Sequence, residues 1–264
     1  MPSLDSSDQT ENATYDELSD EELLRYSRQI MLPKFDIAGQ LSLKNASVLI
    51  LGLGGLGSPA ALYLGAAGVG NLVLVDDDQV DLSNLQRQVI HSQKRIGQNK
   101  VESAAVQLSE INPHINCECI TQRLEGDALK SAIDKVDLIL DCSDNFSTRF
   151  EVNRYCVETK TPLVSAAAIR MEGQISVYDS RNENSPCYQC LYPEGSEQEL
   201  SCSESGVMSP LVGILGSMQA MEAIKVLSGL GDALVGKLLL LDAMTMQWRS
   251  LTLKKDPACA CCGK

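Results

Sequence analysis

The sequence predicts an α/β protein with a Rossmann-like, doubly wound, mostly parallel sheet. Three observations support this class. Up to residue 168, buried strand-like runs alternate with helix-like segments. A glycine-rich turn at residues 52–57 lies between the first such run and the helix that follows it. The chain has 44% hydrophobic but only 4% aromatic residues, so its interior consists of Leu, Val, Ile and Ala, as in parallel sheets.

The length and the N-terminal segment predict one domain behind a leader. The 264 residues suffice for one large core. Residues 1–18 are acidic and polar and lack the basic start and apolar run of a signal peptide. We expect a disordered leader at 1–18, a single domain at 19–264 and a cytoplasmic protein. Ten cysteines without an export signal favour thiol or metal chemistry over disulfides.

Charge and hydropathy argue against two classes of partner. A formal net charge of −13 disfavours nucleic-acid binding, which needs a basic surface. The longest apolar runs are interrupted by Gly, Ser or charge before they reach membrane-spanning length. We therefore expect neither a nucleic-acid partner nor a membrane partner.

The predicted elements follow in order along the chain. A capping box at Ser19 opens a first helix, with Leu23, Leu24 and Ile30 on its apolar face. Strands are predicted at residues 47–51, 71–76, 115–120, 136–141 and 162–165. The helices between them are predicted to end near residue 67 and to span 98–110 and 145–158.

Beyond residue 168 the pattern changes. Alternation at 174–178, a long polar loop at 179–205, a helix at 210–227 and strands at 238–242 and 248–253 predict an antiparallel C-terminal extension. Several sulfur-containing residues are expected to be simple core packing: Met208, Met218, Met221, Cys117, Cys119, Cys142 and Cys156.

The glycine turn is the first candidate site. Glycines at its first, third and sixth positions allow a tight turn, close approach of phosphate to backbone and close helix packing. Asp76 ends the second strand, 24 positions after Gly52, where a Rossmann protein places the carboxylate that holds ribose hydroxyls. These features suit NAD as well as ATP. Glycines that serve packing and a solvated acidic turn are the simpler alternatives.

Amide and cationic residues follow the second strand. Residues 83–88, which include Arg87, precede Lys100 at the start of the next predicted helix. Because a triphosphate carries more negative charge than a pyrophosphate bridge, two cations near the glycine turn favour ATP. A solvated loop with a surface lysine is the simpler alternative.

Residues 141–145 follow the fourth strand and so reach the same sheet edge as the glycine turn. A carboxylate there could hold Mg²⁺. Alternatively, Asp144 could cap the next helix, and the two roles are compatible.

Two C-x-x-C knuckles are candidates for a metal site. Cys187 with Cys190 and Cys259 with Cys262 would supply four thiolates, as in closed tetrahedral zinc sites. Buried free thiols or a redox pair are the alternatives, and Cys261 makes the second knuckle ambiguous. Zinc is favoured because each knuckle lies in a polar, irregular segment that a metal could order.

Together these residues resemble the ubiquitin-activating-like adenylyltransferase family, over nearly everything after the leader. The segments that carry the resemblance are residues 25–30, 52–57, 83–88, 141–145 and 167–174, together with Asp76, Lys100 and the four knuckle cysteines. In such enzymes the C-terminal glycine carboxylate of a small ubiquitin-like sulfur carrier attacks the α-phosphate of ATP. The products are an acyl-adenylate and pyrophosphate.

The resemblance also implies roles for single residues. Arg28 would be an arginine finger that reaches a second subunit's site, which implies a homodimer. Asp144 with Asn145 would position Mg²⁺ and nucleotide, and Cys187, Cys190, Cys259 and Cys262 would hold Zn²⁺. The implied catalytic set is Arg28, Arg87, Lys100 and Asp144. The implied ATP-binding set is Gly55, Asp76, Ser83, Asn84, Leu85, Gln86, Arg87, Lys100, Asp144 and Asn145.

Similarity at residues 169–174 and 204–210 favours the branch that acts on the small subunit of molybdopterin synthase, in molybdenum cofactor biosynthesis. The branch that acts on the thiamine-pathway carrier is the alternative. Cys202 stands where relatives that pass sulfur keep a reactive cysteine, and we expect it to be dispensable. The chain ends two residues after Cys262, so we expect a separate sulfur-donor protein.

Two other classes are weighed against this one. An NAD-dependent oxidoreductase would explain residues 52–76 but would leave Arg87 and Lys100 unexplained. Neither of the two histidines, His91 and His114, has an obvious acid/base partner in the sequence. A noncatalytic scaffold with a zinc staple would show no ATP/pyrophosphate exchange even with the correct carrier present.

Overall fold

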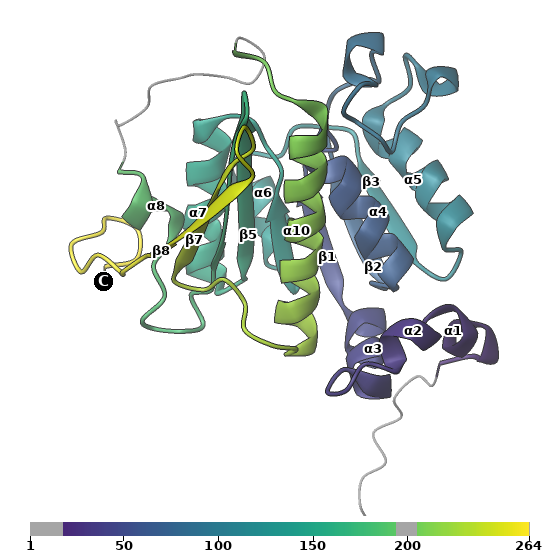
Figure 1. Ribbon diagram of the computed structural model, residues 1–264, viewed down its shortest axis with the longest axis horizontal. Coiled ribbons are helices and arrows are strands. Elements are labelled where there is room, and N and C mark those ends of the chain that lie inside the picture. The colour runs from purple at the N-terminus through teal and green to yellow at the C-terminus, as the bar shows by residue number, and fades with distance from the viewer. Residues whose placement is uncertain (1–17, 194–204, 264) are drawn as a thin grey trace, which may run out of the picture.

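The computed structural model describes residues 18–193 and 205–263, which form an eight-stranded sheet covered by helices (Figure 1). The strands lie in the order β3-β2-β1-β4-β5-β6-β7-β8. Apart from Leu18, the expected leader lies outside the described residues. Five neighbouring strands are parallel: β1 (Ser47–Leu51), β2 (Asn71–Val75), β3 (Asn116–Ile120), β4 (Leu138–Asp141) and β5 (Leu163–Ile169). This order confirms the doubly wound prediction.

Helices cover both faces of the sheet (Figure 1). On one face lie α4 (Gly57–Ala67), α5 (Lys100–Ile111) and α10 (Ser209–Ser228); on the other lie α6 (Gly126–Ile133) and α7 (Phe146–Thr159). Ile50 and Leu140 belong to the core cluster of the first face, whereas Leu49 and Ile139 belong to that of the second. Since alternate residues of a strand point to opposite faces, the central strands must be apolar at every position.

The C-terminal part extends the sheet in the antiparallel sense, as predicted. β6 (Glu172–Tyr178) pairs with β5, β7 (Lys237–Asp242) pairs with β6, and β8 (Gln247–Thr252) pairs with β7. The described part of the polar segment before α10 contains α8 (Tyr188–Leu191), a helix of one turn. Two 3₁₀ turns, η1 (Leu82–Asn84) and η2 (Gln93–Arg95), lie between β2 and α5.

Three short helices precede the sheet: α1 (Asp20–Arg25), α2 (Ser27–Ile30) and α3 (Asp36–Asn45). The capping box at Ser19 is confirmed. The predicted apolar face is wrong, because Leu24 is 77% exposed and the helix breaks at Tyr26. Tyr26 is buried and its hydroxyl accepts a hydrogen bond from Asn112 over 2.7 Å, so tertiary contact decides the break.

Some residues predicted to pack in the core lie at the surface instead. Met208 and Met221 are 53% and 56% exposed. Cys119 is exposed, and it lies on β3, which is an edge strand of the sheet. Cys142 and Cys156 are buried as predicted, and burial raises the pKa of both thiols.

By length and composition alone, α10 could cross a membrane, so the expectation that no segment reaches that length was wrong. In its most apolar window 44% of the residues are buried inside the protein. The helix contacts α4, β5 and β6, and a core helix passes the same length and composition test. The apolar character of α10 is thus explained by packing on the sheet.

Candidate active site

A cavity of about 600 Å³ opens at the carboxyl ends of the parallel strands. It lies where β1 and β4 are neighbours and the sheet begins to wind in opposite directions, the place where open α/β sheets bind ligands. One end of the cavity, the glycine-turn end, includes Gly54, Gly55, Asp76 and Lys100. The other, the hairpin end, is lined by residues of β5, β6, β7 and β8.

Steric reasons explain the glycines of the turn. Gly52 has a φ of +93°, and a Cβ on it would lie 2.9 Å from the carbonyl oxygen of Cys142. A Cβ on Gly57 would lie 1.9 Å from the carbonyl oxygen of Gly52. Among the described residues, the backbone N–H groups of Gly54 and Gly55 find no acceptor. Free N–H groups just before the start of α4 are the donors with which such a turn binds anions.

Asp76 and Lys100 meet at the glycine-turn end. Asp76 Oδ2 accepts a hydrogen bond from the Leu53 N–H over 2.7 Å, and its Oδ1 lies 3.9 Å from Lys100 Nζ. Lys100 Nζ also lies 2.7 Å from Asp78 Oδ2. Burial raises the pKa of Asp76, and the charge of Lys100 opposes that rise. A buried lysine and a carboxylate that anchors the glycine turn thus lie side by side at this end of the cavity.

The segment after β2 is only partly brought to the cavity. Asn84, Arg87 and Gln88 line it, whereas Ser83, Leu85 and Gln86 do not. Ser83 instead donates from its N–H and its hydroxyl to the N-cap residue Asp81 at the start of η1, and its carbonyl oxygen accepts from Arg87 Nη1 over 3.2 Å. Gln88 is 3% exposed; its Nε2 donates to Asn84 Oδ1 over 2.7 Å, while its Oε1 has no partner among the described residues. Gln88 is thus a cavity residue outside the predicted binding set.

The corner after β4 supplies the second wall of the cavity. Asp144 and Asn145 both line it, and Asp144 is exposed. The alternative cap role for Asp144 was wrong, because Asn145 is the N-cap of α7 and its Oδ1 accepts from the Thr148 N–H over 2.9 Å. Asp144 is therefore not the N-cap of α7, and it lines the cavity.

Arg149 is a cavity residue that sequence reasoning missed. It is 7% exposed, and its Nη2 donates to the carbonyl oxygens of Ser143 over 2.6 Å and Ala166 over 3.1 Å. Its Nε lies 3.9 Å from the buried carboxylate of Asp141. A charged residue on the inward face of α7, one turn after the Asp141 corner, was the available signal.

The hairpin end of the cavity is lined by residues of mixed polarity, several of them small. Ala167, Ala168 and Gly173 line it together with Gln174, whose side chain accepts from the Tyr192 hydroxyl over 2.8 Å. The rim carries charged residues of both signs, Glu172, Asp242 and Arg249. A slender extended chain would fit against small residues of this kind better than a bulky one.

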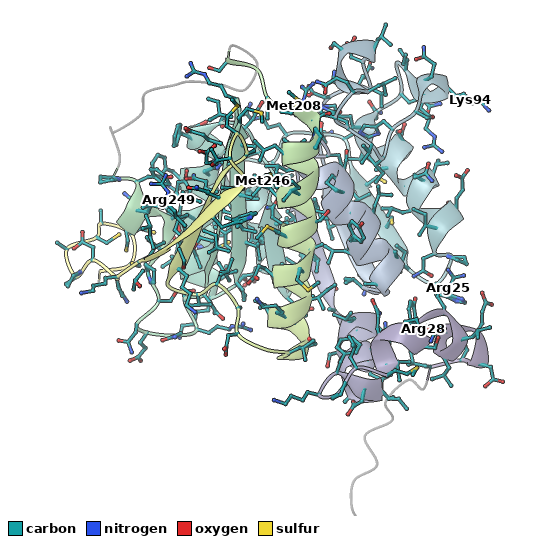
Figure 2. The ribbon with its side chains drawn as sticks, viewed as in Figure 1. Arg25, Arg28, Lys94, Met208, Met246 and Arg249 are labelled. Atoms are coloured by element: carbon teal, nitrogen blue, oxygen red, sulfur yellow. The ribbon has the colours of Figure 1, made fainter. Side chains whose placement is uncertain are left out.

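Arg28 lies away from this cavity. It is exposed on α2, among the N-terminal helices, and it makes no hydrogen bond or ion pair within residues 18–193 and 205–263. In Figure 2, Arg28 and Met208 lie at opposite ends of the molecule, and α10 begins at the Met208 end. Arg28 therefore cannot serve the cavity of its own chain.

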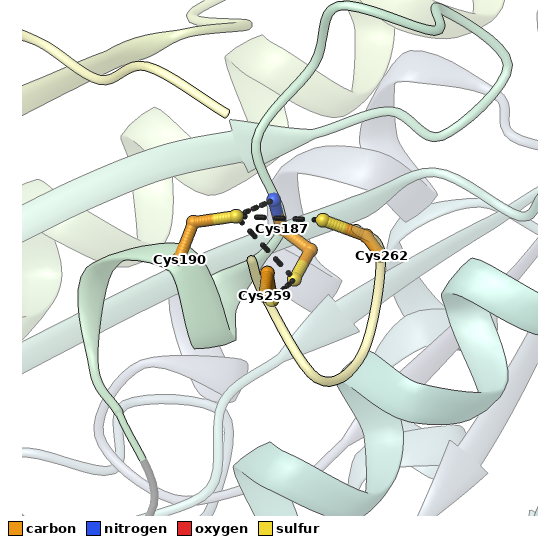
Figure 3. A group of neighbouring side chains, drawn as sticks. All are labelled: Cys187, Cys190, Cys259 and Cys262. Carbon is orange, nitrogen blue, oxygen red and sulfur yellow. Dashed lines mark hydrogen bonds between the residues drawn. The ribbon is translucent and has the colours of Figure 1, made fainter. Parts of the chain in front are cut away.

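Four thiols from the two knuckles converge at the end of the chain (Figure 3). The Sγ of Cys187 lies 3.9 Å from the Sγ of Cys190 and 3.7 Å from the Sγ of Cys259. The Sγ atoms of Cys190 and Cys262 lie 3.4 Å apart. A tetrahedral zinc site with Zn–S bonds of about 2.3 Å has S···S edges of about 3.8 Å. The cluster is therefore of a size that could hold a zinc ion, and the distances are too long for disulfides.

Cys261 stands outside this quartet. Its Sγ accepts a hydrogen bond from Asn153 Nδ2 over 3.3 Å, and it is not among the four mutually close thiols. Cys202 lies outside the described residues.

The sheet order, the glycine turn and the cavity at the switch point define the class: a doubly wound α/β protein with a phosphate-binding type of turn. A model of the ThiF family matches residues 26–261, and the chain belongs to that family. Its curated relatives include the molybdopterin-synthase adenylyltransferase of Salmonella typhimurium, 53% identical over 94% of this chain and 99% of the relative. The ThiS adenylyltransferase of Escherichia coli is 47% identical, over 93% and 97% of the two chains.

Solved structures agree with the fold. A crystal structure of E. coli MccB with AMPCPP and MccA superposes with a TM-score of 0.81 and 25% identity, covering 95% of this chain and 76% of that one. A structure of PaaA superposes with a TM-score of 0.78 at 24% identity, which supports the fold alone.

Proposed function

We propose that this protein adenylates the C-terminal glycine carboxylate of a ubiquitin-like sulfur carrier, the small subunit of molybdopterin synthase, at the expense of ATP. The observation that carries the proposal is the two-ended cavity. The Gly54 and Gly55 N–H groups, which have no acceptor among the described residues, and Lys100 lie at one end, and Ala167, Ala168 and Gly173 line the other. The names of the two curated relatives support the same reaction class.

The chemistry needs no general base, because a carboxylate is already ionised at neutral pH. Catalysis then consists of aligning that carboxylate with the α-phosphate and stabilising charge on the departing pyrophosphate. Lys100 and Arg87, which both line the cavity, would supply the positive charge. This role suits the two cations better than hydride transfer does, so an NAD-dependent oxidoreductase is the weaker hypothesis.

The proposal includes two metal ions. Asp144 and Asn145 would bind Mg²⁺ together with the nucleotide, since both offer oxygen ligands at the cavity edge. Zn²⁺ would be held by the four knuckle thiols, Cys187, Cys190, Cys259 and Cys262. Its role there is structural, since four thiolates leave no open position for a substrate.

A homodimer is part of the proposal. Arg28 is exposed and far from the cavity of its own chain, so it could act as an arginine finger only in the cavity of a second copy. A cytoplasmic location and a separate sulfur donor also stay predictions.

The deciding experiment is carrier-dependent ATP/pyrophosphate exchange, measured with the purified molybdopterin-synthase small subunit and, in parallel, with the thiamine-pathway carrier. We expect exchange with the first carrier. The 47% identity to a ThiS adenylyltransferase makes the second carrier the necessary comparison. Exchange with the thiamine carrier alone would overturn the choice of carrier. Exchange with neither, combined with tight nicotinamide binding in a fluorescence titration, would overturn the reaction class.

A further inference from the structure

Leu53, the second residue of the glycine turn, is held from two sides. Its N–H donates to Asp76 Oδ2 over 2.7 Å. Its carbonyl oxygen lies 3.1 Å from His91 Nε2 and also accepts from Ser58 Oγ over 3.3 Å. Leu53 is fully buried, so these groups fix the two peptide planes that flank it without help from solvent.

His91 is suited to hold that carbonyl as a neutral donor. It is 7% exposed, and its Nδ1 lies 2.9 Å from Ser103 Oγ. Burial lowers the pKa of His91 to about 4, and the charges of Lys100 and Arg95 act in the same direction. Because a carbonyl oxygen only accepts, we assign the single proton of the neutral ring to Nε2. Nδ1 then accepts from the Ser103 hydroxyl, which fixes both the tautomer and the ring orientation.

The direction of the Leu53 carbonyl decides where the next N–H points. In a planar trans peptide the C=O of one residue and the N–H of the next point in opposite directions. Holding the Leu53 oxygen against His91 therefore turns the Gly54 N–H away from His91. Gly54 lines the cavity, and its N–H has no acceptor in the described part of the chain.

We propose that His91 is a positioning residue for the nucleotide: by holding the Leu53 carbonyl, it presents the Gly54 N–H to a phosphate of ATP. His91 does not line the cavity and does not touch the ligand itself. Its contribution is preorganisation, because the donor is aligned before binding rather than ordered by it. The inference rests on the proposed function, which makes ATP the ligand of this end.

The test compares His91→Leu with His91→Gln in carrier-dependent pyrophosphate exchange. Leu fills similar space but cannot donate, whereas Gln can donate to the Leu53 carbonyl and accept from Ser103. For His91→Leu we expect the KM for ATP to rise roughly tenfold, with kcat changed by less than about threefold. We expect His91→Gln to recover most of the loss. His114→Gln is the matched control, because His114 is the other histidine and contacts Glu21, away from the cavity.

A second measurement covers the case in which His91→Leu folds poorly. Ser103→Ala removes the partner of Nδ1 and leaves the imidazole in place, and we expect it to raise the KM for ATP in the same direction by a smaller factor. In the wild-type protein, ¹⁵N NMR of His91 should report the Nε2–H tautomer at neutral pH. A predominant Nδ1–H tautomer, or unchanged KM values in well-folded His91→Leu, would overturn the inference. Absence of exchange in the wild type would instead count against the proposed function.

Discussion

The ammonium group of Lys100 lies 2.7 Å from the Asp78 carboxylate, and that carboxylate is 72% exposed while the lysine side chain is only 6% exposed. The pair therefore joins a cation inside the cavity to an anion at its solvent side. A triphosphate can replace such a solvent-side partner without leaving the lysine uncompensated. The position of Lys100 is set by the start of α5, where its backbone lies. Its ion pair with Asp78 therefore still allows the ammonium group to contact a phosphate.

Replacing Lys100 tests the proposed charge stabilisation. We expect Lys100→Met to lower the kcat of pyrophosphate exchange by roughly 100-fold to 1000-fold, because a donor aimed at developing charge is lost. Lys94→Met is the control, since Lys94 is an exposed lysine outside the cavity lining and lies at the surface in Figure 2. Equal losses in the two variants would mean that net charge, and not the position of Lys100, matters.

Removing Arg28 tests the shared site. We expect Arg28→Ala to bind ATP like the wild type but to exchange pyrophosphate poorly, because the missing group belongs to the neighbouring cavity. Mixing Arg28→Ala with Lys100→Met chains should restore roughly a quarter of wild-type activity, since one of the two sites in each mixed dimer is intact. Activity that stays absent after subunit exchange, verified by mass spectrometry, would argue against an arginine finger in trans.

The thiol quartet predicts one zinc ion per chain. We expect metal analysis of purified protein to find that stoichiometry, and Cys190→Ser to lose the ion and lower the midpoint of thermal unfolding by several degrees. Cys261→Ser should keep the ion, because Cys261 lies outside the quartet. Loss of zinc from Cys261→Ser with retention in Cys259→Ser would show that the second knuckle is assigned to the wrong pair.

Acid should destabilise the fold through His91. Its folded pKa of about 4 lies below the ordinary value of 6.5, so between these values the unfolded state binds more protons. The free energy of unfolding therefore falls as pH falls from 6.5 towards 4, by roughly 2 to 3 kcal/mol in all. Urea unfolding of wild type and His91→Gln at pH 7 and pH 4.5 isolates this contribution, because all other titrating groups are shared. Parallel pH dependences in the two proteins would contradict the prediction.

The central strands β1, β2, β4 and β5 could be predicted because they are short, mostly buried apolar runs, and burial on both faces leaves them no other pattern. The short helix α3 could not, since Gly39 and the polar residues of this segment weaken a helical period that tertiary packing restores. Helix α6 was missed although its pattern is present, because Leu129 and Ile133 lie four residues apart and both are buried. The exposure of Leu24 and Met221 was mispredicted for a related reason. An apolar side chain can be buried at little cost, but whether it is buried depends on which elements pack against it.

The sequence by itself determined the doubly wound class, the glycine turn at β1 and the cations after β2, because local geometry and the order of elements demand them. Only the tertiary structure decided which side chains share the cavity. It brought in Arg149 and Gln88, left out Ser83, Leu85 and Gln86, and placed Arg28 at the opposite end of the molecule. It also placed His91 against the Leu53 carbonyl, 38 residues away in the chain. Contacts of that range depend on how elements pack, and no pattern of neighbouring residues encodes them.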